Sequence, residues 1–293
     1  MKRFTLLFSA VFFCITTFSQ VKSASKEDVA TFMKSKTYFV NEEDPLSAFN
    51  EYIRTKLTEV WKITPFDVIT SEQFEKKSKD DKSSFVFISQ ARFSKTKTSL
   101  FSAGTTVFDN LDTYDYTIIN LVLGNKTGNI NLMPDLCIVP VAYSEVSDER
   151  YDYKFGALLA FMQYYIKFTI ANPGKDIENL VKENAPKLKS YELWITKEDL
   201  ADDVNTPDKI KKFYSYPVKF ATTDEIKLAI EQGNPKVAFL HKVGPEGTAN
   251  GDSRCWKFVI AAKDGIPLYF DSHKISDKKP DKFLDDDFKG MSK

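Results

Sequence analysis

Histidine, cysteine and arginine are scarce in this chain of 293 residues, which has two, three and five of them respectively. Catalytic pairs and metal sites need several such side chains converging, and no His-x-x-His, Cys-x-x-Cys or His-Glu-x-x-His spacing occurs. Glycine-rich phosphate loops of the Walker or dinucleotide-binding type are missing too. The sequence therefore predicts no metal site, no cofactor and no familiar catalytic constellation.

An excess of positive charge is also missing, since 41 basic residues face 41 acidic ones. Proteins that bind nucleic acid cluster positive charge on one surface, so a nucleic-acid partner is not expected. Almost all the basic residues are lysines. Lysine acts mainly as a flexible, well-hydrated surface charge, whereas arginine is favoured for bidentate recognition of phosphates.

The amino terminus has the pattern of an export signal. Lys2 and Arg3 precede an apolar run over residues 4–18, and small residues follow it. The run is shorter than the roughly 20 apolar residues that a membrane-spanning helix needs. We therefore expect residues 1–19 to be a signal peptide and the mature protein to be periplasmic or extracellular, without a transmembrane segment.

Two cysteines remain beyond this segment, Cys137 and Cys255. In an oxidising compartment they can form one disulfide, which would tie two parts of the chain together. Each also lies among apolar residues of a predicted strand, which suits a buried free thiol. Both alternatives stay open at the level of sequence.

A stretch of the chain occurs twice, about 150 residues apart. Residues 34–44 match 189–199 without a gap, and residues 65–89 match 217–241, which pairs Ser89 with His241. The pattern agrees position by position although few residues are identical, as expected of an old tandem duplication.

Helix-start signals recur at matching places in the two copies. Thr70 with Gln73, and Thr222 with Glu225, each have the spacing of a capping box, in which two side chains bond the first backbone amides of a helix. In the first copy, Asp44 followed by a proline predicts a further helix start.

These patterns predict an α+β fold of two tandem homologous lobes, each approximately α-β-α-β-α-β-β-β. The lobes are residues 26–146 and 175–275. The most apolar mature segment lies between them, and we expect residues 150–173 to form a buried hydrophobic helix that joins the lobes. The charged tail, residues 276–293, is expected to fray into solvent.

Near the end of the second copy, a capped helix precedes a predicted hairpin over residues 256–270 with an Asp264-Gly265 turn. This segment resembles the small exported domains associated with peptidase propeptides, the PepSY type. The tandem arrangement as a whole resembles exported envelope proteins of Gram-negative bacteria that have no assigned activity. The resemblance implies export and supplies no site residues.

From these features we expect a non-enzymatic exported protein that either binds a partner or has a structural role in the bacterial envelope. Its partner would be a protein or a glycan, and a cleft between the lobes is the expected place for a pocket. Aromatic side chains in the first variable loop are candidate contacts, namely Phe101, Phe108 and Tyr114.

Two alternatives belong to other functional classes. Ser253 follows Gly251-Asp252, and Asp271 and His273 come later, an order that resembles the Gly-Asp-Ser hydrolases and would make the protein a secreted, esterase-like hydrolase. The other alternative is a peptidase inhibitor or propeptide-like module.

Overall fold

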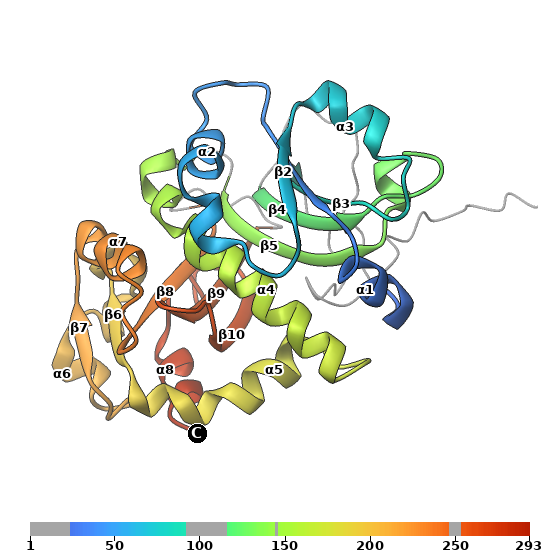
Figure 1. The fold of residues 1–293 in the computed structure, drawn as a ribbon. Coiled ribbons are helices and arrows are strands. Elements are labelled where there is room, and N and C mark those ends of the chain that lie inside the picture. Colours follow the sequence, from blue (N-terminus) through green and yellow to red (C-terminus); the bar gives the residue numbers. More distant parts are fainter. Residues whose placement is uncertain (1–23, 92–115, 144–145, 246–252) are drawn as a thin grey trace, which may run out of the picture.

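The computed structural model describes residues 24–91, 116–143, 146–245 and 253–293, which form two lobes around one helix (Figure 1). The first lobe contains α1 (Lys26–Phe32), β1 (Thr37–Val40), α2 (Ala48–Val60), β2 (Phe66–Ile69), α3 (Ser71–Lys77), β3 (Ser84–Ala91), β4 (Tyr116–Leu123) and β5 (Asp135–Tyr143). The joining helix is α4 (Phe155–Ala171). The second lobe contains α5 (Ile177–Asn184), β6 (Glu192–Ile195), α6 (Pro207–Ile210), β7 (Val218–Phe220), α7 (Thr223–Glu231), β8 (Val237–Val243), β9 (Arg254–Ala261), β10 (Pro267–Lys274) and α8 (Asp285–Met291).

The two lobes have the same sheet topology. The strand order is β2-β1-β3-β4-β5 in the first and, read from the matching end, β7-β6-β8-β9-β10 in the second. In each lobe the first strand pairs in parallel with the next two, and the last two strands are antiparallel. The predicted α+β fold with two similar lobes is therefore confirmed.

The strand registers correct the predicted alignment by one residue. Thr37 lies opposite Ser84 in the first sheet, whereas its counterpart Glu192 lies opposite Val237 in the second. The segment from the helix cap to the strand is thus one residue longer in the second lobe, and the counterpart of His241 is Ile88 rather than Ser89. Every residue of β8 is buried, so its sequence has no alternation that could reveal which side chains share a face.

The local signals at helix ends are confirmed in most places. Both predicted capping boxes form, at Thr70 and at Thr222. The predicted start at Asp44 is wrong, because α2 begins three residues later with Ser47 as its cap. Asp44 instead accepts a hydrogen bond from the amide of Leu46 (2.9 Å), a local turn that competes with the helix.

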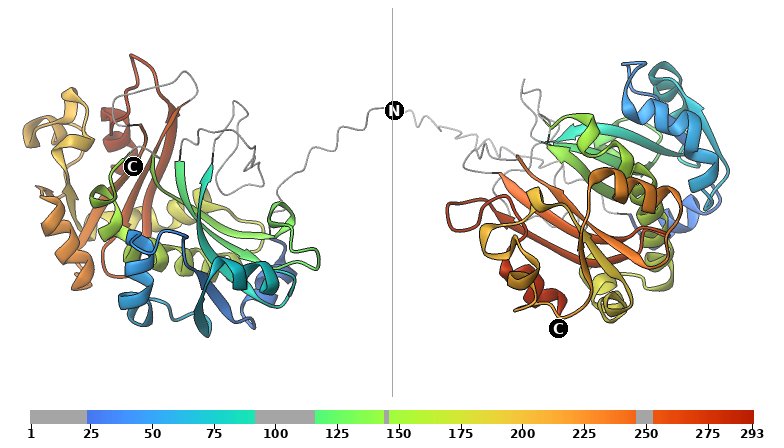
Figure 2. Two further views of the ribbon diagram at one scale, coloured as in Figure 1. Left: turned by 90° about the horizontal axis from the view of Figure 1, so that it is seen from above. Right: turned by 90° about the vertical axis from the view of Figure 1, so that its left-hand side faces the viewer.

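Helix α4 lies between the two lobes and is buried on most of its surface (Figures 1 and 2). Its apolar residues belong to the largest core cluster, which also contains residues of α2 and β5 in the first lobe and of β8 and β9 in the second. The side chain of Gln163 interrupts this apolar surface and is satisfied: its amide donates to the carbonyl of Val60 (3.0 Å), and its oxygen accepts from the amide of Lys62 (2.8 Å). The predicted buried joining helix is confirmed, with its start at Phe155.

The hairpin turn between β9 and β10 rests directly on this helix. Gly265 has a φ of +69°, as the Asp-Gly turn predicts. A Cβ atom at this position would lie 2.2 Å from the backbone nitrogen of Phe161. Glycine is therefore required here by the backbone conformation and by the close approach to α4.

The charged tail does not fray, contrary to the expectation for residues 276–293. It folds back onto the second lobe, where Phe283 and Phe288 are fully buried. Asp287 is buried as well and accepts from the ammonium of Lys257 and, at 2.7 Å, from the hydroxyl of Tyr269. Most residues of the tail are polar, but its few apolar side chains pack into the hydrophobic core that lies within the second lobe.

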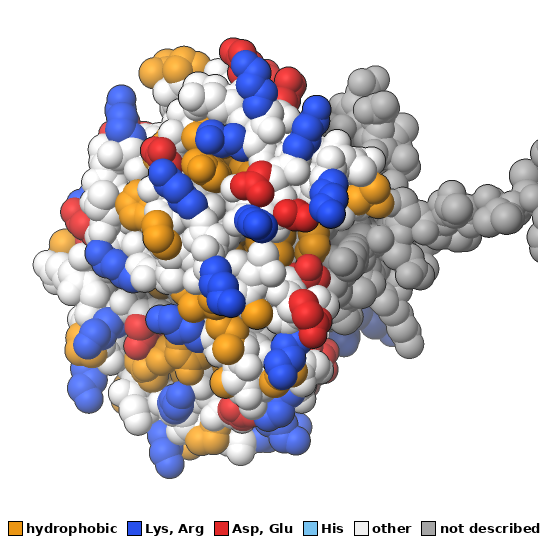
Figure 3. All heavy atoms as spheres, turned by 45° about the vertical axis from the view of Figure 1, so that its right-hand side comes forward, with side chains coloured by type: hydrophobic (Ala, Val, Ile, Leu, Met, Phe, Trp, Pro, Cys, Tyr) orange, Lys and Arg blue, Asp and Glu red, His pale blue; other side chains and the backbone are white. Residues whose placement is uncertain are grey.

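On the face seen in Figure 3, basic side chains are spread among acidic ones, with apolar side chains between them. Within the described residues, no helix has both the length and the apolar character needed to cross a bilayer.

A candidate ligand-binding recess between the lobes

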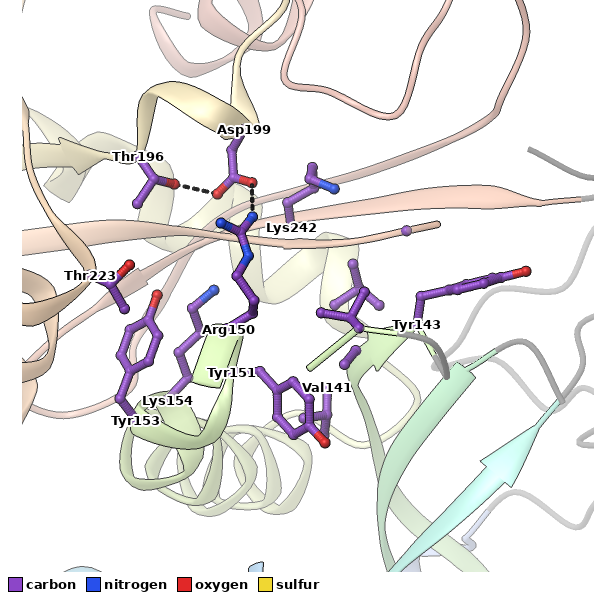
Figure 4. A pocket seen from close by; sticks show the side chains of 14 residues that line it. Val141, Tyr143, Arg150, Tyr151, Tyr153, Lys154, Thr196, Asp199, Thr223 and Lys242 are labelled. Atoms are coloured by element: carbon purple, nitrogen blue, oxygen red, sulfur yellow. Dashed lines mark hydrogen bonds and ion pairs between the residues drawn. The ribbon is translucent and has the colours of Figure 1, made fainter. Parts of the chain in front are cut away.

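A small recess, with a volume of about 20 Å³, lies where the two lobes meet (Figure 4). Its walls come from both lobes and from the segment before α4. The lining residues are the end of β5 with Val146, then Arg150, Tyr151, Tyr153 and Lys154, then Thr196, Asp199 and Thr223, and the end of β8 with Gly244. The expected position of a pocket, between the lobes, agrees with this lining.

The topology of the second lobe places its polar side chains here. Strands β6 and β8 are parallel neighbours, so their carboxyl ends reach the same edge of the sheet. Thr196 directly follows β6, and Lys242 lies near the end of β8. Ligands of sheets with parallel strands commonly bind outside these carboxyl ends.

Among the charged residues that line the recess, Lys154 is unusual in its burial and its surroundings. It ends a short 3₁₀ helix (Asp152–Lys154) and is only 5% exposed, although it is a lysine. Figure 4 shows its ammonium pointing into the recess beside Tyr153 and Arg150. Its Nζ lies 5.2 Å from the centre of the Tyr153 ring, and no carboxylate or carbonyl of the described residues accepts from it.

Asp199 is the acidic group of the recess. It lies in a 3₁₀ helix (Lys197–Asp199), is 5% exposed, and its Oδ2 accepts from the hydroxyl of Thr196 at 2.5 Å. Its Oδ1 lies 3.9 Å from the guanidinium of Arg150, a long ion pair across the mouth of the recess (Figure 4).

Lys242 is already neutralised. Its Nζ lies 2.8 Å from Oδ2 of Asp281, and both side chains are buried. Burial alone would lower the pKa of Lys242, but the carboxylate of Asp281, and to a smaller extent that of Asp199, raises it above the ordinary value. Lys242 therefore stays charged and bound to the folded tail.

The aromatic candidates Phe101, Phe108 and Tyr114 lie outside the described residues, so their role stays a prediction.

The residues of the hydrolase alternative do not form a triad. Nε2 of His273 lies 2.8 Å from the carbonyl of Pro280, and its Nδ1 has no hydrogen-bond partner in the described part of the chain. The carboxylate of Asp271 is 2.9 Å from the ammonium of Lys257 instead. Ser253 is buried, with 1% exposure. A nucleophilic serine needs a histidine as its base, and the histidine an orienting acid, so this arrangement lacks both links.

Cys137 and Cys255 are free thiols, and both are buried. Burial raises the pKa of each thiol well above its usual range. Of the two alternatives, the structure has the buried thiols and not the disulfide.

Sequence reasoning did not identify the lining residues of the recess. In the sequence, Lys154 lies near the start of a predicted helix, and Asp199 lies at the end of a repeated segment. The signal that was available is the lysine placed directly before the most apolar segment, a position where its stem becomes buried. The structure also shows no group of three or more His, Cys, Asp or Glu side chains, within the described ranges, that could hold a metal ion.

Comparisons with models of protein families, with curated proteins and with solved structures find no match to this chain. The resemblances to PepSY-type domains and to exported envelope proteins therefore stay predictions, and the geometry of the recess is what supports a function.

Proposed function

We propose that this is an exported, non-enzymatic binding protein that holds a small ligand in the recess between its lobes. The observation that carries the proposal is the lining itself: both repeats and the joining segment contribute polar side chains to one small recess. Pockets at the junction of two structural units are preferred sites for small ligands. Export is inferred from the charged and apolar pattern of residues 1–19.

A thermal-shift screen of the purified protein against glycans, peptides, lipids and small metabolites tests this function. A ligand at 100 times its dissociation constant adds about 2.7 kcal/mol of stability and raises the melting temperature. Thr223→Trp would fill the mouth of the recess from the first residue of α7, which is partly exposed. Thr58→Trp, on the exposed face of α2, is the matched control.

The expected outcome is a ligand that stabilises the wild type and Thr58→Trp but leaves Thr223→Trp unchanged. A ligand that stabilises all three proteins equally would bind elsewhere and would contradict the proposal. In that case the better proposal is that the protein binds another protein, which crosslinking in the envelope would identify.

A further inference from the structure

We propose that the ligand of the recess carries a small oxyanion group, a carboxylate or a phosphate, which the ammonium of Lys154 binds. This inference rests on the proposed function, because it names the chemistry of the ligand for the same site.

The first argument is the state of Lys154. Its residue is 5% exposed, so most of its stem is packed in protein, and its ammonium has only the face of the Tyr153 ring as a partner among the described residues. Removing a charge from water is costly unless an opposite charge or hydrogen-bond acceptors replace the water. The stem of Lys154 is held in the protein while its ammonium still contacts solvent in the recess, so an acceptor from outside the protein can reach it.

The second argument is the sum of charges. The recess is lined by three cations, Arg150, Lys154 and Lys242, and by one carboxylate, that of Asp199. Asp281 neutralises Lys242, and Asp199 faces Arg150 at 3.9 Å. For Lys154, in contrast, no carboxylate of the described residues lies within ion-pair distance. A negative group on a ligand would provide one.

The third argument is the set of hydrogen-bond donors beside the ammonium. In Figure 4 the hydroxyl of Tyr153 lies between the ammonium of Lys154 and the hydroxyl of Thr223. Neither hydroxyl has a hydrogen-bond partner among the described residues, and Tyr153 is only 8% exposed. An oxyanion has several lone pairs and can accept from the ammonium and from both hydroxyls together.

Other ligand chemistries fit less well. A cation would be repelled by Lys154 and Arg150. A wholly apolar ligand would displace water from the ammonium without replacing its hydrogen bonds, and would pay the full desolvation penalty of a charged group.

The test uses inorganic phosphate and acetate as probes, each titrated at constant ionic strength maintained with sodium chloride. Melting temperatures are measured for the wild type, for Lys154→Met and for Lys167→Met. Methionine keeps the apolar volume of the stem and removes the charge. Lys167 is a matched control, since it is an exposed lysine on α4.

We expect at least one of the two probes to raise the melting temperature of the wild type and of Lys167→Met, and Lys154→Met to lose at least nine-tenths of that shift. A shift in melting temperature with phosphate alone would indicate a ligand that carries a phosphate. A shift with acetate alone would indicate a ligand that carries a carboxylate.

Two results would overturn the inference. One is a shift of equal size in Lys154→Met, which would place the anion elsewhere. The other is no shift with either probe, while a neutral ligand from the screen stabilises the wild type but not Thr223→Trp. That second result would contradict the oxyanion inference but not the proposed function. The proposed function fails instead if a ligand stabilises Thr223→Trp as much as it stabilises the wild type.

Discussion

The hydroxyl of Tyr116 in the first lobe joins the backbone of Arg254 in the second through two hydrogen bonds. It accepts from the amide nitrogen at 2.8 Å and donates to the carbonyl oxygen at 2.9 Å. The Tyr116 ring packs on that of Trp256 with centroids 4.3 Å apart. One side chain thus provides both polar and aromatic contacts between the lobes.

Tyr116→Phe should keep the ring contact and lose both hydrogen bonds. We expect a loss of about 1–3 kcal/mol in the free energy of unfolding, because two backbone groups of Arg254 lose their partner. Urea unfolding measures this. Tyr38→Phe is the matched control, since the Tyr38 hydroxyl makes no hydrogen bond within the described residues, and it should change stability by less than about 0.5 kcal/mol. Equal losses in the two variants would contradict the prediction.

The C-terminal tail should be a stabilising part of the second lobe. Phe288→Ala removes a fully buried ring from α8 and is expected to cost about 3–5 kcal/mol. Lys278→Ala, at an exposed position of the same tail, should be nearly neutral. Chemical unfolding of both variants decides the point, and a neutral Phe288→Ala would mean that the tail frays after all.

His241 should make stability depend on pH. Burial, and then the nearby charge of Lys154, lower the pKa of His241 to about 3, while an unfolded histidine titrates near 6.5. Between these values the unfolded chain binds a proton that the folded chain does not. Stability therefore falls as the pH is lowered through this window, by up to about 1.4 kcal/mol per pH unit.

Replacing this side chain isolates its contribution. His241→Gln is expected to be less stable than the wild type at pH 7, and the difference should shrink by about 2 kcal/mol at pH 5. The comparison between variants is needed because burial raises the pKa of Asp135 to about 7, and that group changes stability in the opposite direction over the same range. Urea unfolding at both pH values gives the two differences. A difference that stays constant would contradict the prediction.

Lys154→Met should be more stable than the wild type when no ligand is present. The substitution removes a charge from a largely buried position, and we expect a gain of about 1 kcal/mol, seen as a rise of about 2–4 °C in melting temperature. Lys167→Met should leave the melting temperature unchanged. A loss of stability in Lys154→Met would show that the ammonium already has a strong partner in the unliganded protein.

The elements that sequence reasoning identified depend on local chemistry. The capping boxes at Thr70 and Thr222 and the turn at Gly265 each depend on residues close together in the chain, and all three form as predicted. The repeat predicted the succession of helices and strands along the chain, whereas the order of the strands within each sheet came from the structure.

The features it missed depend on contacts between distant residues. Asp287 looks like part of an exposed acidic run until Lys257, 30 residues earlier, is placed against it. The recess combines Arg150 and Lys154 with Asp199 and Thr223, which only the packing of the lobes brings together. The register of β8 was ambiguous because both of its faces are buried.

The burial of α4 limits how the two lobes can move relative to one another. Phe161, Met162 and Ile166 are fully buried in the core that the two lobes share, and each such side chain contributes about 1.5–3 kcal/mol. A hinge motion that separates the lobes would expose that shared core to water and would lose this stabilisation. We therefore expect thermal or chemical unfolding to show one cooperative transition for both lobes, since neither lobe keeps a complete core without α4.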